Sequence, residues 1–439
     1  MSSSVKAPTK SPAKSKSKSA KVQSKSKSSQ RLVVVFDSGT SVLKILYVVN
    51  DTRVKWMTMG AEYFPLPASR ADSLNLDLGR GEPEDHAWFR TNKSGDCHTV
   101  GLLARNQRAT TSIKKTKKEL LAYKIMAAIG AISSREDLSS SFELELGVLI
   151  PYNEYRHLKE DGWVADLKKA LASFYFQDQR LRVKLLDFLC MPEGYGIANY
   201  LNQESKKAAQ DFNRGNSALI MLGHRNTSCL FFRRGTISHR ESGTSMLGFH
   251  TLLEKLLDKF PGLSPSDFIN AMTTNTIELS HHRENFNYAE RATTINWAHL
   301  LGFQELEEEK LQRWQLCFDE SLAEYWRLLA DWLDEILPTI EQVNVMVFAG
   351  GSYHLLESQL SKYAKSRGAR SWESEAKNHL KKYLLWQNAP QKERFMRENL
   401  GLRFADAWGF FLKFANYDES KVLERLSGEV VVKPLKIGD

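Results

Sequence analysis

A run of apolar residues that is broken by one short polar turn constrains the fold of this chain more than any other feature. The stretch VVVFDSGTSVLKILYVV spans residues 33–49. Runs of Val, Ile and Leu favour strands, and Gly, Ser and Asp favour turns, so the stretch predicts two strands joined by DSGTS. A carboxylate at the tip of a buried strand needs an explanation. Asp37 either caps the turn or faces a ligand that the turn holds.

Strands alternate with helices along the rest of the chain. A hairpin is predicted at residues 216–242, where two β-rich runs flank the sequence RRG with Gly235 at the turn. Further strands are predicted at residues 143–152, 181–191 and 344–351, and helices at 113–131, 154–175, 246–337, 353–365, 374–386 and 403–416. This order is typical of an α/β fold, and the same theme occurs twice, once from residue 32 and once from residue 217.

The positive charge of the chain is concentrated at its start. Residues 1–30 contain eight lysines and no acid, and removing these charges from the net charge of +9 leaves about +1 for residues 31–439. Such a segment cannot bury apolar surface, so we expect a disordered tail. The tail either holds DNA or anionic lipid through its lysines, or only keeps the protein in solution. A second basic stretch, KKTKK at 114–118, is expected to be a solvated helix start, with a contact to DNA or a filament neighbour as the alternative.

Cysteine spacing and hydropathy indicate a cytoplasmic protein. The four cysteines lie far apart and form no CxxC motif, so we expect reduced thiols rather than disulfides or metal ligands. No apolar run reaches the roughly 18 residues that a membrane span needs, and the first residues lack the apolar region of a secretory signal.

Three further polar turns follow predicted strands. In CMPEG (190–194), Glu193 either orients an attacking water or caps the following helix. MLGHRNT (221–227) is either a second phosphate-binding turn or a plain turn whose His224 and Arg225 face solvent. VFAGGS (347–352) leads a strand into two glycines, which either let a ligand approach the backbone or allow tight packing of a strand on a helix.

Together with DSGTSVLK, these motifs resemble those of the actin-like ATPases, and within them most closely the bacterial ParM/StbA plasmid-segregation branch. The resemblance covers about residues 32–415. DSGTSVLK and LGHRNT are similar to the two phosphate loops of that family, MPEG to the strand end with its catalytic glutamate, and FAGG to its adenosine-binding turn. HTVGLLA (98–104) and LRFADAWGFF (402–411), the closing helix, also resemble the branch.

The resemblance implies a role for each matching residue. Asp37 would hold a Mg²⁺ ion through water, Lys44 would support the phosphate charge, and Glu193 would be the catalytic residue that positions the hydrolytic water. The other implied contacts to nucleotide are Ser38, Gly39, Thr40 and Ser41 in the first phosphate loop, Gly223 and Thr227 in the second, and Gly350 and Gly351 at the adenosine. The implied cofactors are ATP and Mg²⁺, with GTP not distinguished from ATP.

One position departs from the family pattern. The second phosphate loop of the family opens with an aspartate, and Met221 stands there in this chain. Methionine carries no charge and is only a weak acceptor, so we expect weaker placement of Mg²⁺ and slower hydrolysis, by roughly 10²–10⁴-fold. His224 or Arg225 would then contact phosphate in place of the metal, if the turn does not simply face solvent.

The resemblance also implies the architecture and the function. We expect an α/β, actin-like (ribonuclease H-like) duplicated two-domain fold with a nucleotide cleft between its halves. The expected segments are a disordered tail at 1–30, a first domain at 31–215 with a small insert at about 52–100, a second domain at 216–400 with a helical insert at about 246–337, and a closing helix with a C-terminal tail at 401–439. The expected function is ATP-dependent filament formation that segregates or positions DNA, with self-association as one interaction and DNA, a DNA-bound adaptor or membrane as the partner of the tail. A non-polymerising pseudo-ATPase or nucleotide switch is the alternative.

Overall fold

The computed structural model describes most of the chain between residues 30 and 415. The described residues are 30–50, 53–76, 81–107, 109, 115–158, 162–204, 206–259, 308–339, 342–373, 392 and 400–415. The expectations for the N-terminal tail, for the helix at 374–386, for the C-terminal tail and for much of the insert at 246–337 lie outside these residues.

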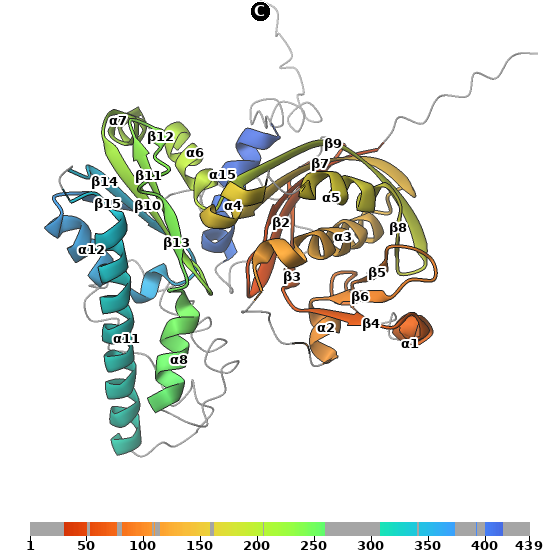
Figure 1. Ribbon diagram of the computed structural model, residues 1–439, viewed down its shortest axis with the longest axis horizontal. Coiled ribbons are helices and arrows are strands. Elements are labelled where there is room, and N and C mark those ends of the chain that lie inside the picture. Colours follow the sequence, from red (N-terminus) through yellow and green to blue (C-terminus); the bar gives the residue numbers. More distant parts are fainter. Residues whose placement is uncertain are drawn as a thin grey trace, which may run out of the picture.

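A nine-stranded sheet forms the N-terminal half of the molecule (Figure 1). Its strands follow the spatial order β3-β2-β1-β7-β9-β8-β5-β6-β4. Their bounds are Arg31–Asp37 (β1), Val42–Val49 (β2), Lys55–Gly60 (β3), Tyr63–Leu66 (β4), Trp88–Arg90 (β5), Cys97–Val100 (β6), Ser141–Ile150 (β7), Phe174–Phe176 (β8) and Gln179–Pro192 (β9). The helices of this half are Ala71–Leu76 (α1), Leu102–Asn106 (α2), Lys117–Arg135 (α3), Tyr152–Leu158 (α4) and Trp163–Ala172 (α5), with a 3₁₀ turn at Ala68–Arg70.

A six-stranded sheet forms the C-terminal half, with the order β12-β11-β10-β14-β15 and β13 paired to β11. Its strands are Asn216–Leu222 (β10), Thr227–Arg233 (β11), Thr236–Ile237 (β12), Gly243–Ser245 (β13), Val345–Ala349 (β14) and Arg370–Glu373 (β15). Helices Phe249–Lys259 (α8), Glu308–Ile336 (α11) and Glu357–Ser366 (α12) belong to this half, with a 3₁₀ turn at Tyr353–Leu355.

The two sheets repeat one arrangement of strands, as the duplicated pattern of the sequence predicts. In the first sheet, β1 pairs antiparallel with β2 and parallel with β7. In the second, β10 pairs antiparallel with β11 and parallel with β14. The prediction of an α/β fold is therefore confirmed. The predicted RRG turn does connect two strands, β11 and β12, and Arg234 and Gly235 take the positive φ of a tight hairpin. Where a single helix was expected at 154–175, the structure has two, α4 and α5.

Helices Tyr195–Glu204 (α6), Lys206–Arg214 (α7) and Leu400–Phe414 (α15) complete the described fold, and α6 and α15 lie between the two sheets (Figure 1). One apolar cluster includes Val35 of the first sheet, Leu219 of the second and Trp408 of α15. The two helices cross in backbone contact, because a Cβ atom on Gly196 or Gly409 would overlap backbone atoms of the other helix. The sheets therefore share a continuous core at this crossing.

No helix within the described residues is both long and apolar enough to cross a membrane.

Candidate ligand-binding site

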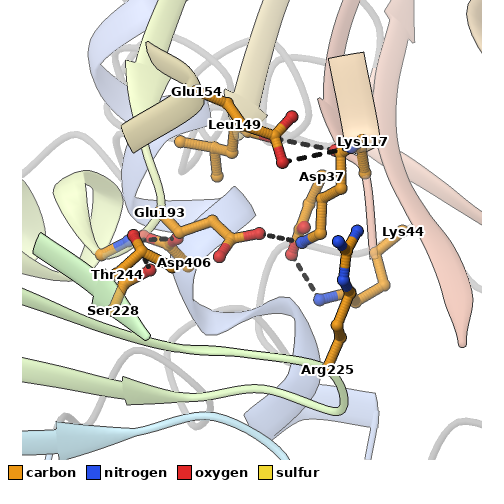
Figure 2. A network of polar contacts seen from close by, with 12 residues as sticks. Asp37, Lys44, Lys117, Leu149, Glu154, Glu193, Arg225, Ser228, Thr244 and Asp406 are labelled. Atoms are coloured by element: carbon orange, nitrogen blue, oxygen red, sulfur yellow. Dashed lines mark hydrogen bonds and ion pairs between the residues drawn. The ribbon is translucent and has the colours of Figure 1, made fainter. Parts of the chain in front are cut away.

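The polar turns that the sequence singles out all lie at the carboxyl ends of parallel strands. Asp37 ends β1, and Glu193 directly follows β9 in the same sheet. Gly223 follows β10 and Gly350 follows β14 in the other sheet. In open α/β folds, ligands bind beyond these strand ends. The two sheets therefore each offer one edge of a candidate site (Figure 2).

Asp37 forms an ion pair with Lys44 in the first turn. The two residues lie directly opposite each other in the β1–β2 ladder, and Lys44 Nζ donates to Asp37 Oδ2. The side chain of Asp37 is only 5% exposed, so the pairing compensates its burial. Gly39 is required at the turn because a Cβ atom there would overlap the Val42 carbonyl oxygen. Ser38 Oγ donates to the Leu149 carbonyl at 3.3 Å, and Thr40 and Ser41 are partly exposed.

Glu193 forms a second ion pair, with Lys117 at the start of α3. Lys117 is only 8% exposed, so the expectation of a solvated helix start at 114–118 is wrong for this residue. Burial favours the neutral amine, but the carboxylates of Glu193 and Asp37 outweigh burial and raise the pKa of Lys117 above its usual value. Lys117 is therefore an ammonium ion at neutral pH, and it adds a cation to the site that sequence analysis did not assign.

The start of α3 is held in place by two sets of capping bonds. Thr116 and Glu119 form a capping box. The carboxylate of Glu154, on α4, accepts hydrogen bonds from the backbone N–H groups of Lys117 at 3.1 Å and Lys118 at 2.8 Å. These bonds fix the helix terminus from which Lys117 extends toward Glu193.

The carboxylate of Asp406, rather than that of Glu193, caps the helix after MPEG. From α15 it accepts hydrogen bonds from the backbone N–H groups of Gly194 at 2.7 Å and Ile197 at 3.1 Å. Burial raises the pKa of Asp406 to about 7, the two backbone bonds oppose the rise, and the charges of Asp37 and Glu193 add to it. Sequence analysis missed this residue, although an acid inside the apolar helix LRFADAWGFF was a visible signal.

Asp406 is expected to make the folded protein less stable as pH rises from about 4 to about 7. An unfolded aspartate ionises near pH 3.9, whereas Asp406 in the folded state holds its proton up to a pH of about 7. Between these values only the folded state binds the proton, so the free energy of unfolding falls with pH by up to about 1.4 kcal/mol per unit, and the decline ends above pH 7. Urea unfolding between pH 5 and 8 should show this decline in the wild type but not in Asp406→Asn. The exposed Asp258→Asn is the control, and an equal slope in both variants would contradict the assignment.

The turn between β10 and β11 carries a buried arginine across to the N-terminal half. Arg225 is 9% exposed and donates from its guanidinium to the carbonyl of Lys115, so it does not face solvent. Its Nε atom is buried and has no hydrogen-bond partner among the described atoms. Burial, followed by the nearby His250 and Arg403, lowers the pKa of His224 to about 4, so this imidazole is neutral at pH 7. Of these two turn residues, Arg225 is the one that supplies charge.

Two other predicted residues of the second sheet differ in their surroundings. The hydroxyl of Thr227 donates to the Leu247 carbonyl at 2.6 Å and the residue is fully buried, so this hydroxyl makes its bond within the C-terminal half. Met221 is partly exposed, and its Cγ would lie 3.2 Å from a Cβ atom on Gly194. The methionine side chain thus lies against the turn that carries Glu193.

The glycine pair after β14 has two distinct environments. Gly350 has φ +101°, and a Cβ atom there would overlap the Leu222 carbonyl oxygen, so close packing of the two turns requires glycine. Ser352 Oγ strengthens this packing by donating to the Gly223 carbonyl at 3.3 Å. A Cβ atom on Gly351, by contrast, would meet no atom within 4 Å. Gly351 therefore borders open space.

Comparisons with known proteins bear on the fold. No protein-family model matches the chain, and no curated protein matches it. Among solved structures, it is similar to the actin-like protein Alp7A, with a TM-score of 0.53 and 13% identity over 91% of this chain and 99% of that one. It is similar to Ta0583, an archaeal actin homologue, with a TM-score of 0.53 and 13% identity over 88% of this chain and 100% of that one. A ParM protein, psk41 ParM, aligns with a TM-score of 0.48 and 12% identity over 90% and 99% of the two chains. From the likeness to Alp7A and Ta0583, which spans most of each chain, we conclude that this chain has the actin-like fold.

Proposed function

We propose that this protein binds a nucleoside triphosphate between its two sheets and assembles into nucleotide-dependent filaments that segregate or position DNA. The observation that carries the proposal is the gathering of Lys44, Lys117 and Arg225 around the carboxyl ends of strands from both sheets (Figure 2). Buried cations beside glycine-containing turns favour a polyanionic ligand such as a phosphate chain.

The residues present fit the parts of a nucleotide. In the turn formed by Ser38, Gly39, Thr40 and Ser41, the N–H groups of Ser38 and Gly39 donate to the carbonyls of Leu149 and Asp37. The partly exposed Thr40 and Ser41 would therefore offer their N–H groups and hydroxyls to phosphate. The buried Nε of Arg225 would gain a partner from a phosphate oxygen. The open space beside Gly351 would admit the nucleoside. ATP and GTP fit these contacts equally.

A magnesium ion fits the site less well. Mg²⁺ prefers an octahedral shell of oxygen ligands, in which one or two protein carboxylates join water and phosphate. In this chain Asp37 is already paired with Lys44, Glu193 is paired with Lys117, and Met221 brings no oxygen. Within the described residues, no group of three or more His, Cys, Asp or Glu side chains is arranged to hold a metal ion. Glu193, restrained by the ammonium, would also position a hydrolytic water less well, so slow turnover is part of the proposal.

Filament formation and the contact to DNA concern parts of the molecule outside the candidate site. The actin-like fold supports self-association, and the shared core at α6 and α15 gives a route by which nucleotide could alter the angle between the halves. The basic tail at residues 1–30 would bind DNA, a DNA-bound adaptor or anionic membrane in the cytoplasm. Deleting residues 2–30 should abolish binding to DNA or lipid, and nucleotide affinity should not change.

Light scattering after addition of ATP or GTP with Mg²⁺ tests the filament. A rise that persists would support filaments that hydrolyse nucleotide slowly, and a rise that decays would mean that hydrolysis is fast despite Met221. A flat trace with confirmed nucleotide binding would favour the non-polymerising nucleotide switch. A flat trace without nucleotide binding would overturn the proposal as a whole.

Gly351→Ala is expected to weaken nucleotide binding about tenfold and to leave the fold intact. The added methyl group meets no protein atom, so it costs little stability, but it would project into the space that the proposal gives to the nucleoside. Calorimetric titration with ATP and GTP measures the affinity, and thermal unfolding of the free protein measures the stability. Wild-type affinity in a folded Gly351→Ala variant would reject this placement of the nucleoside.

A further inference from the structure

We infer that the ammonium group of Lys117 takes the place of a divalent cation in this site, so that nucleotide phosphates bind here without metal. The inference rests on the proposed function and adds to it the identity of the cation that neutralises the phosphates. The position of the Lys117 ammonium relative to the two acids supports this inference first. Lys117 contacts Glu193, and the charge of Asp37 also acts on it, so the ammonium lies near both acids that would otherwise organise a metal and its water (Figure 2).

The second support is that the ammonium is a built-in part of the interior. The side chains of Lys117 and Glu193 are 7% and 12% exposed, so neither end of the ion pair is a mobile surface group. The capping box of Thr116 and Glu119, together with the Glu154 carboxylate, holds the helix start from which Lys117 extends. A divalent ion entering beside Asp37 would have to displace this ammonium from Glu193 or lie next to its positive charge. Both are unfavourable in a buried site.

The third support is the donor chemistry. An ammonium group has three N–H donors, and one of them is used for Glu193. The remaining donors suit the oxygens of a phosphate chain, because lysine binds phosphate as a compact charge. Lys44 and Arg225 bring two further cations to the same place. Met221, which lies against the turn that carries Glu193, offers no oxygen ligand to a metal.

The decisive measurement compares nucleotide affinity with and without metal. The full-length protein is titrated calorimetrically with ATP and with GTP, once in excess EDTA and once in Mg²⁺. We expect the two dissociation constants to agree within about threefold. Affinity that falls tenfold or more in EDTA would overturn the inference and leave the proposed function standing. Absence of binding in both buffers would overturn the proposed function and the inference with it.

Lys117→Met isolates the residue, and the exposed Lys168→Met on α5 is its matched control. We expect Lys117→Met to lose at least tenfold in affinity in EDTA, and Mg²⁺ to restore part of the loss because the site can then admit the ion. Lys168→Met should behave as the wild type. Equal affinity of Lys117→Met and wild type in EDTA would overturn the inference. If Lys117→Met does not fold, the comparison of the wild type in the two buffers decides the matter.

Discussion

Replacing Gly409 with alanine is expected to lower the free energy of unfolding by about 3 kcal/mol, although alanine is the better helix former. Helix propensity alone would favour alanine by about 1 kcal/mol. The added Cβ atom, however, would overlap the carbonyl oxygen of Gly196 on α6 and approach the Cβ atom of Tyr200 within 3.0 Å. A backbone atom cannot rotate away as a side chain can, so the helices must separate, and overpacking of this kind costs about 1–3 kcal/mol or more.

Urea unfolding at constant pH measures this effect. Gly351→Ala is the control, since it makes the same change where the methyl group meets no protein atom, and its unfolding midpoint should stay at the wild-type value. A midpoint for Gly409→Ala equal to or above that of the wild type would mean that α6 and α15 do not cross in contact. Because both helices belong to the core that joins the sheets, we also expect Gly409→Ala to weaken any response of light scattering to nucleotide.

The strand ends of the candidate site could be predicted from the sequence because their signals are local. An apolar run followed directly by Asp37, Glu193, Gly223 or Gly350 marks a strand and the turn after it within about ten residues. The Asp37–Lys44 pair is also local, since a hairpin brings residues seven apart face to face. The duplicated α/β order follows from the same short-range patterns, and these are the parts of the fold that the structure confirms.

The partners of the charged groups could not be predicted, because tertiary contacts between distant segments choose them. Lys117 and Glu193 are 76 positions apart, and the Asp406 carboxylate caps Gly194 from 212 positions away. Nothing in the sequence KKTKK distinguishes Lys117 from its neighbours. Only the folded structure, in which α3 starts at Lys117, shows that this lysine is buried. The sequence around Arg225 likewise reads as a solvated turn, whereas in the structure Arg225 is buried and bonded to the Lys115 carbonyl of the other half. Local reasoning thus finds Asp37, Lys44 and Glu193, and misses Lys117 and Asp406, whose partners lie on distant segments.

Removing both members of the Lys117–Glu193 ion pair is expected to destabilise the protein by much less than the sum of the two single removals. Lys117→Met leaves the Glu193 carboxylate buried without its partner, which costs about 3–5 kcal/mol. Glu193→Gln is milder, since the ammonium still feels the charge of Asp37. In the double variant Lys117→Met/Glu193→Gln, neither charge of the pair remains. The decrease in its free energy of unfolding should therefore be smaller, by at least about 2 kcal/mol, than the sum of the decreases in the two single variants.

Urea unfolding of the wild type, the two single variants and the double variant at pH 7 gives this coupling energy directly. Additive costs, within about 0.5 kcal/mol, would mean that the pair contributes nothing beyond its separate groups and that Lys117 is free to leave Glu193. Strong coupling would mean that the ammonium is fixed there before any ligand arrives. A nucleotide would then bind to a site whose central cation is a side chain of the protein. Glu193 would position a water only after its ion pair with Lys117 breaks.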